Sequence, residues 1–324
     1  MKVLVTGATG FVGGHLVKRL INDGHSVRAL VRRGRDLKGF NGRVEIVYGD
    51  ITDPHSLGDA TRDIDMVYHS AALVREAGVP DSLFWKINVE GTRNLLEASH
   101  KHGIKRFIHI STCGVHGDVR NPPATEDSPF NPEDIYQKTK IESERLVMDF
   151  RRKGLPAVII RPAGIYGPGD TRLLKLFKLI KGRKFIMVGD GKTLFHLVYI
   201  DDLIDALILA GQVPDAEGEA FLIAGERYLS LNELTKIIAD FFGVLQRKIH
   251  LPVLPIRLLA IAMEFTFKPL RIEPPLFRRR VDFFTKNRAF DISKAKRILG
   301  YRPGVDIEEG VRLTVDWYKR EGLL

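Results

Sequence analysis

Two residues able to move a proton, Tyr136 and Lys140, stand four positions apart in the sequence. Side chains at this spacing lie on one face of an α-helix. Free tyrosine titrates near pH ~10, and a lysine cation beside the phenol favours the phenolate, so such a tyrosine can exchange a proton near neutral pH. The pair also fits an ordinary solvated helix face. Its catalytic interpretation therefore depends on the motifs around it.

The stretch before Tyr136 predicts the start of a helix. Residues Asn131 to Asp134 offer a capping side chain, a proline for the first turn and two acids for the positive end of the helix. The helix should end near Lys153, because a glycine and a proline follow shortly after it. Tyr136 and Lys140 then lie in its first turns.

A glycine-rich turn near the N-terminus joins a predicted strand, Lys2 to Thr6, to a predicted helix, Gly14 to Asp23. Glycine lets the backbone approach a pyrophosphate, and a helix N-terminus supplies N–H groups and a partial positive charge. Strand, G-x-x-G-x-x-G turn and helix together predict a dinucleotide site. The expected contacts in this turn are Gly7, Thr9, Gly10, Phe11, Val12 and Gly13.

The second predicted strand, Ser26 to Val31, leads into Arg32 and Arg33. An NAD site usually carries an acid there for the ribose 2′-hydroxyl, whereas arginine suits a 2′-phosphate. We therefore expect NADP in preference to NAD. The alternative is that both arginines point to solvent and Asp36 bonds the ribose.

Two further predicted strands should reach the cofactor at their ends. Asp50 and Ile51 follow the strand Val44 to Tyr48, and Asp50 could bond the adenine amine. Small residues, Ala71 and Ala72, follow the strand Met66 to His69 and allow close approach. The next predicted helix, Leu83 to His102, contains Asn88, which either faces solvent or bonds backbone near the strand ends.

Ser111 and Thr112 follow the fifth predicted strand, Arg106 to Ile110. A hydroxyl just beyond a central strand can bond a substrate carbonyl, and the alternative is that it caps a turn. The sixth predicted strand, Ala157 to Ile160, is followed by a loop rich in Pro and Gly that should close over the nicotinamide and substrate.

Composition suits a reducing compartment, and we expect a cytoplasmic protein. The chain has 324 residues, 44% of them hydrophobic, which is enough for one large domain and a smaller one. The single cysteine, Cys113, excludes an intrachain disulfide and a thiolate metal site, and no metal is expected. The N-terminus runs directly into the glycine turn and does not look like a signal peptide.

The net charge of +10 is spread in clusters along the chain. No nucleic-acid motif accompanies it, so a phosphate-rich cofactor is the simpler partner and no specific nucleic acid is expected. The most apolar stretch, Ile249 to Phe267, is interrupted by prolines and charges and should not span a membrane. We expect it to cover the substrate cleft or pack in the second domain. Peripheral membrane contact, helped by Arg278 to Arg280, is less favoured.

Several motifs in order resemble the extended short-chain dehydrogenase/reductase family, over essentially the whole chain. They are T-G-A-T-G-F-V-G at Thr6 to Gly13, G-D at Gly49 and Asp50, H-S-A-A at His69 to Ala72, N-V-E-G-T at Asn88 to Thr92, S-T at Ser111 and Thr112, Y-Q-K-T-K at Tyr136 to Lys140, R-P-A-G-I-Y-G-P-G-D at Arg161 to Asp170, the stretch Phe195 to Asp202, and Phe290 to Pro303.

The resemblance implies roles for particular residues. Tyr136 would be the acid/base, Lys140 would lower its pKa and bond the nicotinamide ribose, and Thr112 would bond the reacting oxygen. Ser111 could share that last role, and Asn88 would support the site. The nicotinamide pocket would include Pro162, Ala163 and Ile165.

Within the family, the chain looks like the dihydroflavonol-reductase and 3β-hydroxysteroid-dehydrogenase branch. The R-x-G-D stretch with which many epimerases bind a sugar diphosphate is absent at Val281 to Thr285. We therefore expect hydride transfer between nicotinamide and a secondary alcohol or ketone. The alternatives are a nucleotide-sugar epimerase or dehydratase that retains NAD, and a non-catalytic cofactor-sensing or RNA-binding protein.

The expected fold is α/β, with a Rossmann-type, doubly wound parallel sheet and a smaller C-terminal substrate domain. Residues 1–165 and about 195–225 should form the cofactor domain, and about 166–194 and 226–324 the substrate domain. The resemblance also implies a homodimer through the helices that carry Asn88 and Tyr136.

Overall fold

The computed structural model describes residues 1–35, 37, 39–40, 42–74, 78–245, 249–267, 275–276 and 278–324. Within these ranges, seven parallel strands form one sheet in the order β11-β6-β5-β4-β1-β2-β3. They are β1 (Lys2–Thr6), β2 (Ser26–Val31), β3 (Val44–Tyr48), β4 (Met66–His69), β5 (Arg106–Ile110), β6 (Ala157–Pro162) and β11 (Ala220–Ile223). The strand order reverses beside β1, which is the expected Rossmann-type arrangement.

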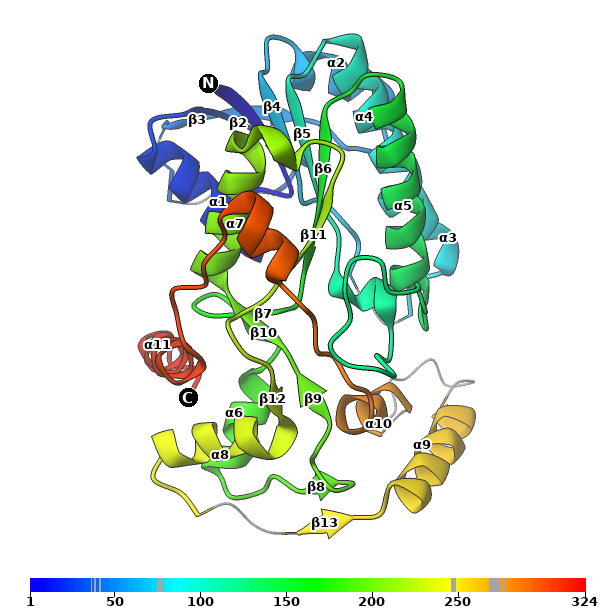
Figure 1. Ribbon diagram of the computed structural model, residues 1–324, viewed down its shortest axis with the longest axis vertical. Coiled ribbons are helices and arrows are strands. Elements are labelled where there is room, and N and C mark those ends of the chain that lie inside the picture. The colour runs from blue at the N-terminus through cyan, green and yellow to red at the C-terminus, as the bar shows by residue number, and fades with distance from the viewer. Residues whose placement is uncertain are drawn as a thin grey trace.

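Helices cover both faces of the sheet (Figure 1). On one face α1 (Phe11–Asn22) packs beside α7 (Ile200–Gln212), and their apolar side chains join those of β1, β5 and β6. On the other face lie α2 (Pro54–Thr61), α4 (Gly91–Lys101) and α5 (Ile135–Arg152). Apart from the exposed edge strand β3, the strands are buried from both sides, which explains their nearly continuous apolar sequences.

Most of the remaining elements contribute to a third apolar cluster. These remaining elements are β7 (Gly164–Tyr166), α6 (Leu174–Lys181), β8 (Met187–Val188), β9 (Leu194–Phe195), β10 (Leu197–Tyr199), β12 (Leu229–Ser230), α8 (Leu231–Phe241), β13 (His250–Leu251), α9 (Val253–Phe267), α10 (Arg278–Thr285) and α11 (Ile307–Arg320). Among the described residues, the exceptions to the cluster are β7, β13 and α9. Phe177 of α6, Leu234 of α8 and Val315 of α11 meet in this cluster. The division of the chain into two domains stays a prediction.

Three local predictions differ from the structure. The helix predicted from Leu83 to His102 is α3 (Asp81–Phe84), a π-helical segment (Trp85–Glu90) and α4. The sixth strand continues to Pro162, and part of the expected loop after it is β7, which pairs with β10. The Tyr136 helix is capped by Asp134, the last residue of the stretch Asn131 to Asp134, and not by a residue that precedes the proline. Asp134 Oδ1 accepts from the N–H of Gln137 at 2.8 Å.

The apolar stretch near residue 260 forms α9, which stands beside α10 at the end of the molecule away from α2 and α4 (Figure 1). Within the described ranges, no helix is long and apolar enough to cross a membrane.

Candidate active site

The glycine turn after β1 is shaped for an anion. Gly7 has φ of +73°, and its carbonyl oxygen accepts from the N–H of Gly10 at 2.9 Å. A Cβ on Gly13 would lie 2.1 Å from that oxygen, so only glycine lets α1 begin this close to the strand. Gly10 caps α1 without a side-chain hydrogen bond, and the first turn holds no acid. The positive end of the helix is therefore not neutralised locally.

The other predicted residues of this turn border the same space. Thr9 and Gly10 are exposed, and Phe11 and Val12 are half-buried at the start of α1. A cradle closed by glycine, open to solvent and lined by helix N–H groups fits a dinucleotide pyrophosphate.

The residues predicted to contact the adenosine lie just beyond β2 and β3. Arg32 and Arg33 are exposed just beyond β2, whereas Asp36 lies outside the described residues. Asp50 is half-buried, and its Oδ1 accepts from both the N–H and the hydroxyl of Thr52 at 2.8 Å. Ile51 is buried against Gly91 at the start of α4.

Asn88 lies inside the protein and bonds backbone, which is one of the two alternatives that the sequence offered. Its Oδ1 accepts from the N–H of Leu73 at 2.7 Å, and its Nδ2 donates to the Leu73 carbonyl at 3.1 Å and to Thr139 Oγ1 at 3.0 Å. Asn88 is 2% exposed, so the solvent-facing alternative is wrong. These bonds fix the segment after β4, where Ala71 and Ala72 are half-buried, to the helix that carries Tyr136.

Lys140 is buried beneath the end of β5. Its Nζ donates to the Ile110 carbonyl at 2.7 Å and lies 3.2 Å from His109 Nε2. Burial lowers the pKa of Lys140 to about 8, although Glu144 opposes the shift. Tyr136 is half-buried one turn earlier on α5.

The two hydroxyls after β5 have different surroundings. Ser111 Oγ is buried and donates to Glu144, which is paired with Arg161 at 2.8 Å. Thr112 is half-buried, and its Oγ1 accepts from the N–H of Gly114 at 3.0 Å, so the predicted turn cap does form. As an acceptor in that bond, Thr112 keeps its own hydrogen for a substrate oxygen.

The Thr112 turn and the Tyr136 helix are in contact. The 3₁₀ turn Cys113–His116 packs against α5, where Gly114 faces Gln137. The Thr112 turn and the first turns of α5, which carry Tyr136 and Lys140, therefore lie together at the carboxyl end of β5.

The predicted nicotinamide residues lie at this same edge. Pro162 and Ala163 are buried at the end of β6, and Ile165 is half-buried in β7. The N–H of Ala163 donates to the Ile223 carbonyl at 2.9 Å, which fixes the turn to β11.

Sequence reasoning missed three buried polar residues of the site, His109, Glu144 and Arg161. His109 and Arg161 interrupt apolar strand runs, and Glu144 stands four residues after Lys140 on the same helix face. A charged or polar residue inside a buried strand needs a partner, and that requirement was a usable signal.

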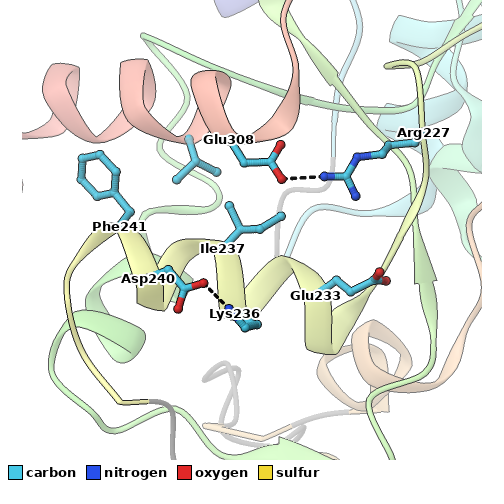
Figure 2. A pocket seen from close by; sticks show the side chains of 8 residues that line it. Arg227, Glu233, Lys236, Ile237, Asp240, Phe241 and Glu308 are labelled. Carbon is cyan, nitrogen blue, oxygen red and sulfur yellow. Dashed lines mark hydrogen bonds and ion pairs between the residues drawn. The ribbon is translucent and has the colours of Figure 1, made fainter.

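A separate pocket of about 460 Å³ lies between α8 and α11 (Figure 2). Four of its charged residues form two pairs, since Arg227 bonds Glu308 at 2.6 Å and Lys236 bonds Asp240. None of the predicted site residues lines it.

Comparison with known proteins identifies the family. Residues 3–224 match the NAD dependent epimerase/dehydratase family. The chain is 31% identical to a decarboxylating sterol-4-alpha-carboxylate 3-dehydrogenase of Candida albicans over 98% of both chains. It is also 31% identical to a 3 beta-hydroxysteroid dehydrogenase/Delta 5-->4-isomerase of Mycobacterium tuberculosis, over 98% of this chain and 90% of the relative.

A solved structure supports the same assignment. UDP-glucuronic acid 4-epimerase from Bacillus cereus, in complex with NAD, superposes with a TM-score of 0.79 at 26% identity, over 99% of this chain and 97% of the epimerase. The resemblance seen in the motifs and the expected fold are thus confirmed. The non-catalytic alternative loses its basis, because the relatives are named as enzymes. The chain belongs to the NAD-dependent epimerase/dehydratase family and is an oxidoreductase of the extended short-chain dehydrogenase/reductase type.

Proposed function

We propose that the chain interconverts a secondary alcohol and a ketone, with Tyr136 as the acid/base and Thr112 as the donor to the reacting oxygen. The observation that carries this proposal is the contact between the Thr112 turn and the first turn of α5. Lys140, anchored on the Ile110 carbonyl, sets its charge beneath the same strand end.

The proton and the hydride take separate routes. A bound nicotinamide ring supplies the hydride acceptor or donor at its C4 position. In oxidation, the C–H electron pair of the alcohol leaves as hydride, and the hydroxyl proton passes to the Tyr136 phenolate. The Lys140 ammonium favours that phenolate electrostatically. The Thr112 hydroxyl orients the substrate oxygen as its bond to carbon becomes double.

The substrate we propose is the hydroxyl of an apolar, sterol-like ring system. Support comes from the dehydrogenases named above, which match nearly the whole chain, and from the missing R-x-G-D stretch. If the substrate carries a carboxylate on the carbon beside the new ketone, the bond between that carbon and the carboxylate can break. Its electron pair forms an enolate, CO₂ leaves, and the enolate then takes up a proton. Released CO₂ distinguishes this reaction from simple oxidation.

The cofactor is a nicotinamide dinucleotide, and we propose a preference for NADP. Arg32 and Arg33 are exposed just beyond β2, where the 2′-phosphate would lie. Binding of NADPH and NADH should be compared in the wild type and in Arg32→Ala/Arg33→Ala. The double variant should weaken NADPH alone. Equal effects on both nucleotides contradict the preference.

A retained-NAD epimerase or dehydratase is the second candidate, supported by the structural likeness to an NAD-bound epimerase. Mass spectrometry of nucleotide released from freshly purified, denatured protein separates the two. Stoichiometric NAD favours the epimerase, whereas an empty site or NADP favours an exchanging dehydrogenase.

Tyr136→Phe tests the mechanism itself. Turnover of a 3-hydroxysteroid should fall by about 10²-fold or more, while the dissociation constant for the cofactor stays nearly unchanged. Lys138→Met is the matched control, because Lys138 lies two residues after Tyr136 on α5 and is exposed, and it should keep full activity. Full activity in Tyr136→Phe contradicts the assigned acid/base.

We also propose a cytoplasmic homodimer built through the helices that carry Asn88 and Tyr136. Leu83 and Trp85, on the segment that leads to Asn88, are 36% and 39% exposed, which suits a contact surface. Light scattering after size exclusion tests this state. The dimer is contradicted if the wild type is a monomer and Trp85→Ser has the same mass in solution. We propose in addition that the chain is divided into two domains, as the sequence predicts.

A further inference from the structure

Within the described part of the chain, helix α9 packs beside α10 and leaves its other side exposed. Of its 15 residues, Ala260 is the one that is fully buried. On its outer side, Leu254, Leu258, Ile261 and Phe265 are 68%, 58%, 43% and 81% exposed. Their spacing of four, three and four residues places them in one stripe along the helix. We call this stripe the α9 apolar face.

More apolar surface lies where the chain enters α9. Ile186 and Ile249 are 39% and 43% exposed, and each precedes one of the paired strands β8 and β13. Scattered exposed apolar residues are normal on proteins, but a continuous apolar stripe on a protruding helix marks a contact with another molecule or a membrane.

Basic side chains flank the α9 apolar face. Arg257 is exposed on α9, and Arg278 of α10 is 61% exposed by its side chain while it bonds Glu264 at 2.7 Å. Glu264 is the single acid of α9, so this pair neutralises it.

The charge distinguishes between two occupants of this face. A second copy of the chain would bring its own α9 apolar face, and therefore its own Arg257, against the first. A surface of anionic lipid headgroups instead offers acyl chains to the leucines and phenylalanine and negative charge to the arginines. The net charge of +10 favours the same occupant.

We propose that α9 lies in the plane of an anionic lipid bilayer, with the α9 apolar face among the acyl chains and Arg257 at the headgroups. The sequence alone did not favour peripheral membrane contact, because helical spacing does not reveal which face is left uncovered. The docking does not depend on the proposed substrate.

Sedimentation of the full-length protein with lipid vesicles tests the proposal. The vesicles are phosphatidylcholine alone, or phosphatidylcholine mixed with phosphatidylserine. The wild type should bind the mixed vesicles at least about tenfold more tightly than the neutral ones, and added salt should reduce this difference. Leu258→Gln/Phe265→Ser should lose most binding to both, and Arg257→Glu should lose mainly the preference for phosphatidylserine.

Tyr48→Ser is the control, since Tyr48 is 53% exposed on the edge strand β3, away from α9 (Figure 1). Circular dichroism and melting temperature confirm that the variants fold. The proposal is overturned if the wild type binds neither vesicle, or if Leu258→Gln/Phe265→Ser binds as well as the wild type. It is also overturned if the wild type is an oligomer that does not bind vesicles and Leu258→Gln/Phe265→Ser turns it into a monomer. The α9 apolar face would then be a contact between two copies of the chain.

Discussion

Lys140 Nζ lies 3.2 Å from His109 Nε2, and both side chains are shut away from solvent beneath the end of β5. Burial, reinforced by the Lys140 charge, lowers the pKa of His109 well below its ordinary value, so the imidazole is neutral. An ammonium can donate only to an unprotonated nitrogen, which places the imidazole hydrogen on Nδ1. Within the described part of the chain, that Nδ1 has no hydrogen-bond partner.

This arrangement predicts how Lys140 affects stability. Its pKa is about 8 in the folded chain and has an ordinary value of 10.5. Below pH 8 both states hold the proton, and the folded state bears the full cost of the buried ammonium. Between these values the unfolded chain binds more protons, so rising pH favours folding. Urea unfolding of the wild type and Lys140→Met should therefore show the wild type gaining stability relative to the variant from about pH 8 to 10.5.

His109→Phe provides the check on that interpretation. The phenyl ring removes an acceptor and keeps the site dry, so the Lys140 pKa should fall further and the change should begin at lower pH. His109→Asn keeps an acceptor and should lie closer to the wild type. A stability difference between the wild type and Lys140→Met that is flat across this range would mean that Lys140 is not shifted.

The two hydroxyls after β5 should respond differently to substitution. Thr112→Val should lower kcat by about 10²-fold, since one positioned donor to a reacting oxygen is worth that much. It should also lower stability by about 0.5–2 kcal/mol, because the turn loses the oxygen that accepts from the N–H of Gly114. Thr112→Ser should restore activity. Ser111→Ala should mainly reduce stability, by about 1–3 kcal/mol, because a buried carboxylate loses a donor. Steady-state kinetics and urea unfolding on the same preparations separate the two effects, and a reversed pattern would make Ser111 the donor.

The Glu144–Arg161 pair carries a stability prediction. Both side chains are buried, so Glu144→Ala leaves a guanidinium without its main partner and should destabilise by about 3–5 kcal/mol. Glu142→Ala on the same helix breaks only a partly exposed pair with Arg145 and should cost less than about 1 kcal/mol. Denaturant midpoints compare the two. Equal losses in the free energy of unfolding would show that the buried pair contributes no more to stability than the exposed one.

The sequence predicted features that depend on neighbouring residues. The strand, glycine turn and helix of Lys2 to Asn22 were found because each is specified by local spacing. The helix cap was misplaced for a non-local reason: the N–H of Asn131 bonds the Val115 carbonyl at 2.9 Å, which holds this residue outside the helix. Likewise, β7 forms only because β10 lies beside it in space.

The site follows the same division. Tyr136 and Lys140 were recognisable from spacing on one helix, but nothing local separates Ser111 from Thr112. Their difference depends on Glu144, which reaches Ser111 from α5 and is itself held by Arg161 of β6. Three elements have to pack before one hydroxyl is buried and the other remains accessible, so a single sequence leaves the choice open.

The glycine cradle offers a matched pair of substitutions at adjacent positions of α1. A Cβ on Gly13 would lie 2.1 Å from the Gly7 carbonyl oxygen, whereas a Cβ on Gly14 would lie 3.6 Å from the nearest atom. Gly13→Ala must therefore push the helix from the turn that precedes it, which should weaken dinucleotide binding by at least about tenfold and lower stability by about 1–3 kcal/mol. Gly14→Ala replaces glycine in an open helical position and should stabilise by about 0.5–1 kcal/mol without weakening the cofactor. Calorimetric titration with NADPH and urea unfolding measure both quantities. If Gly13→Ala binds the dinucleotide as tightly as Gly14→Ala does, the close approach of α1 to Gly7 is not what forms the pyrophosphate site.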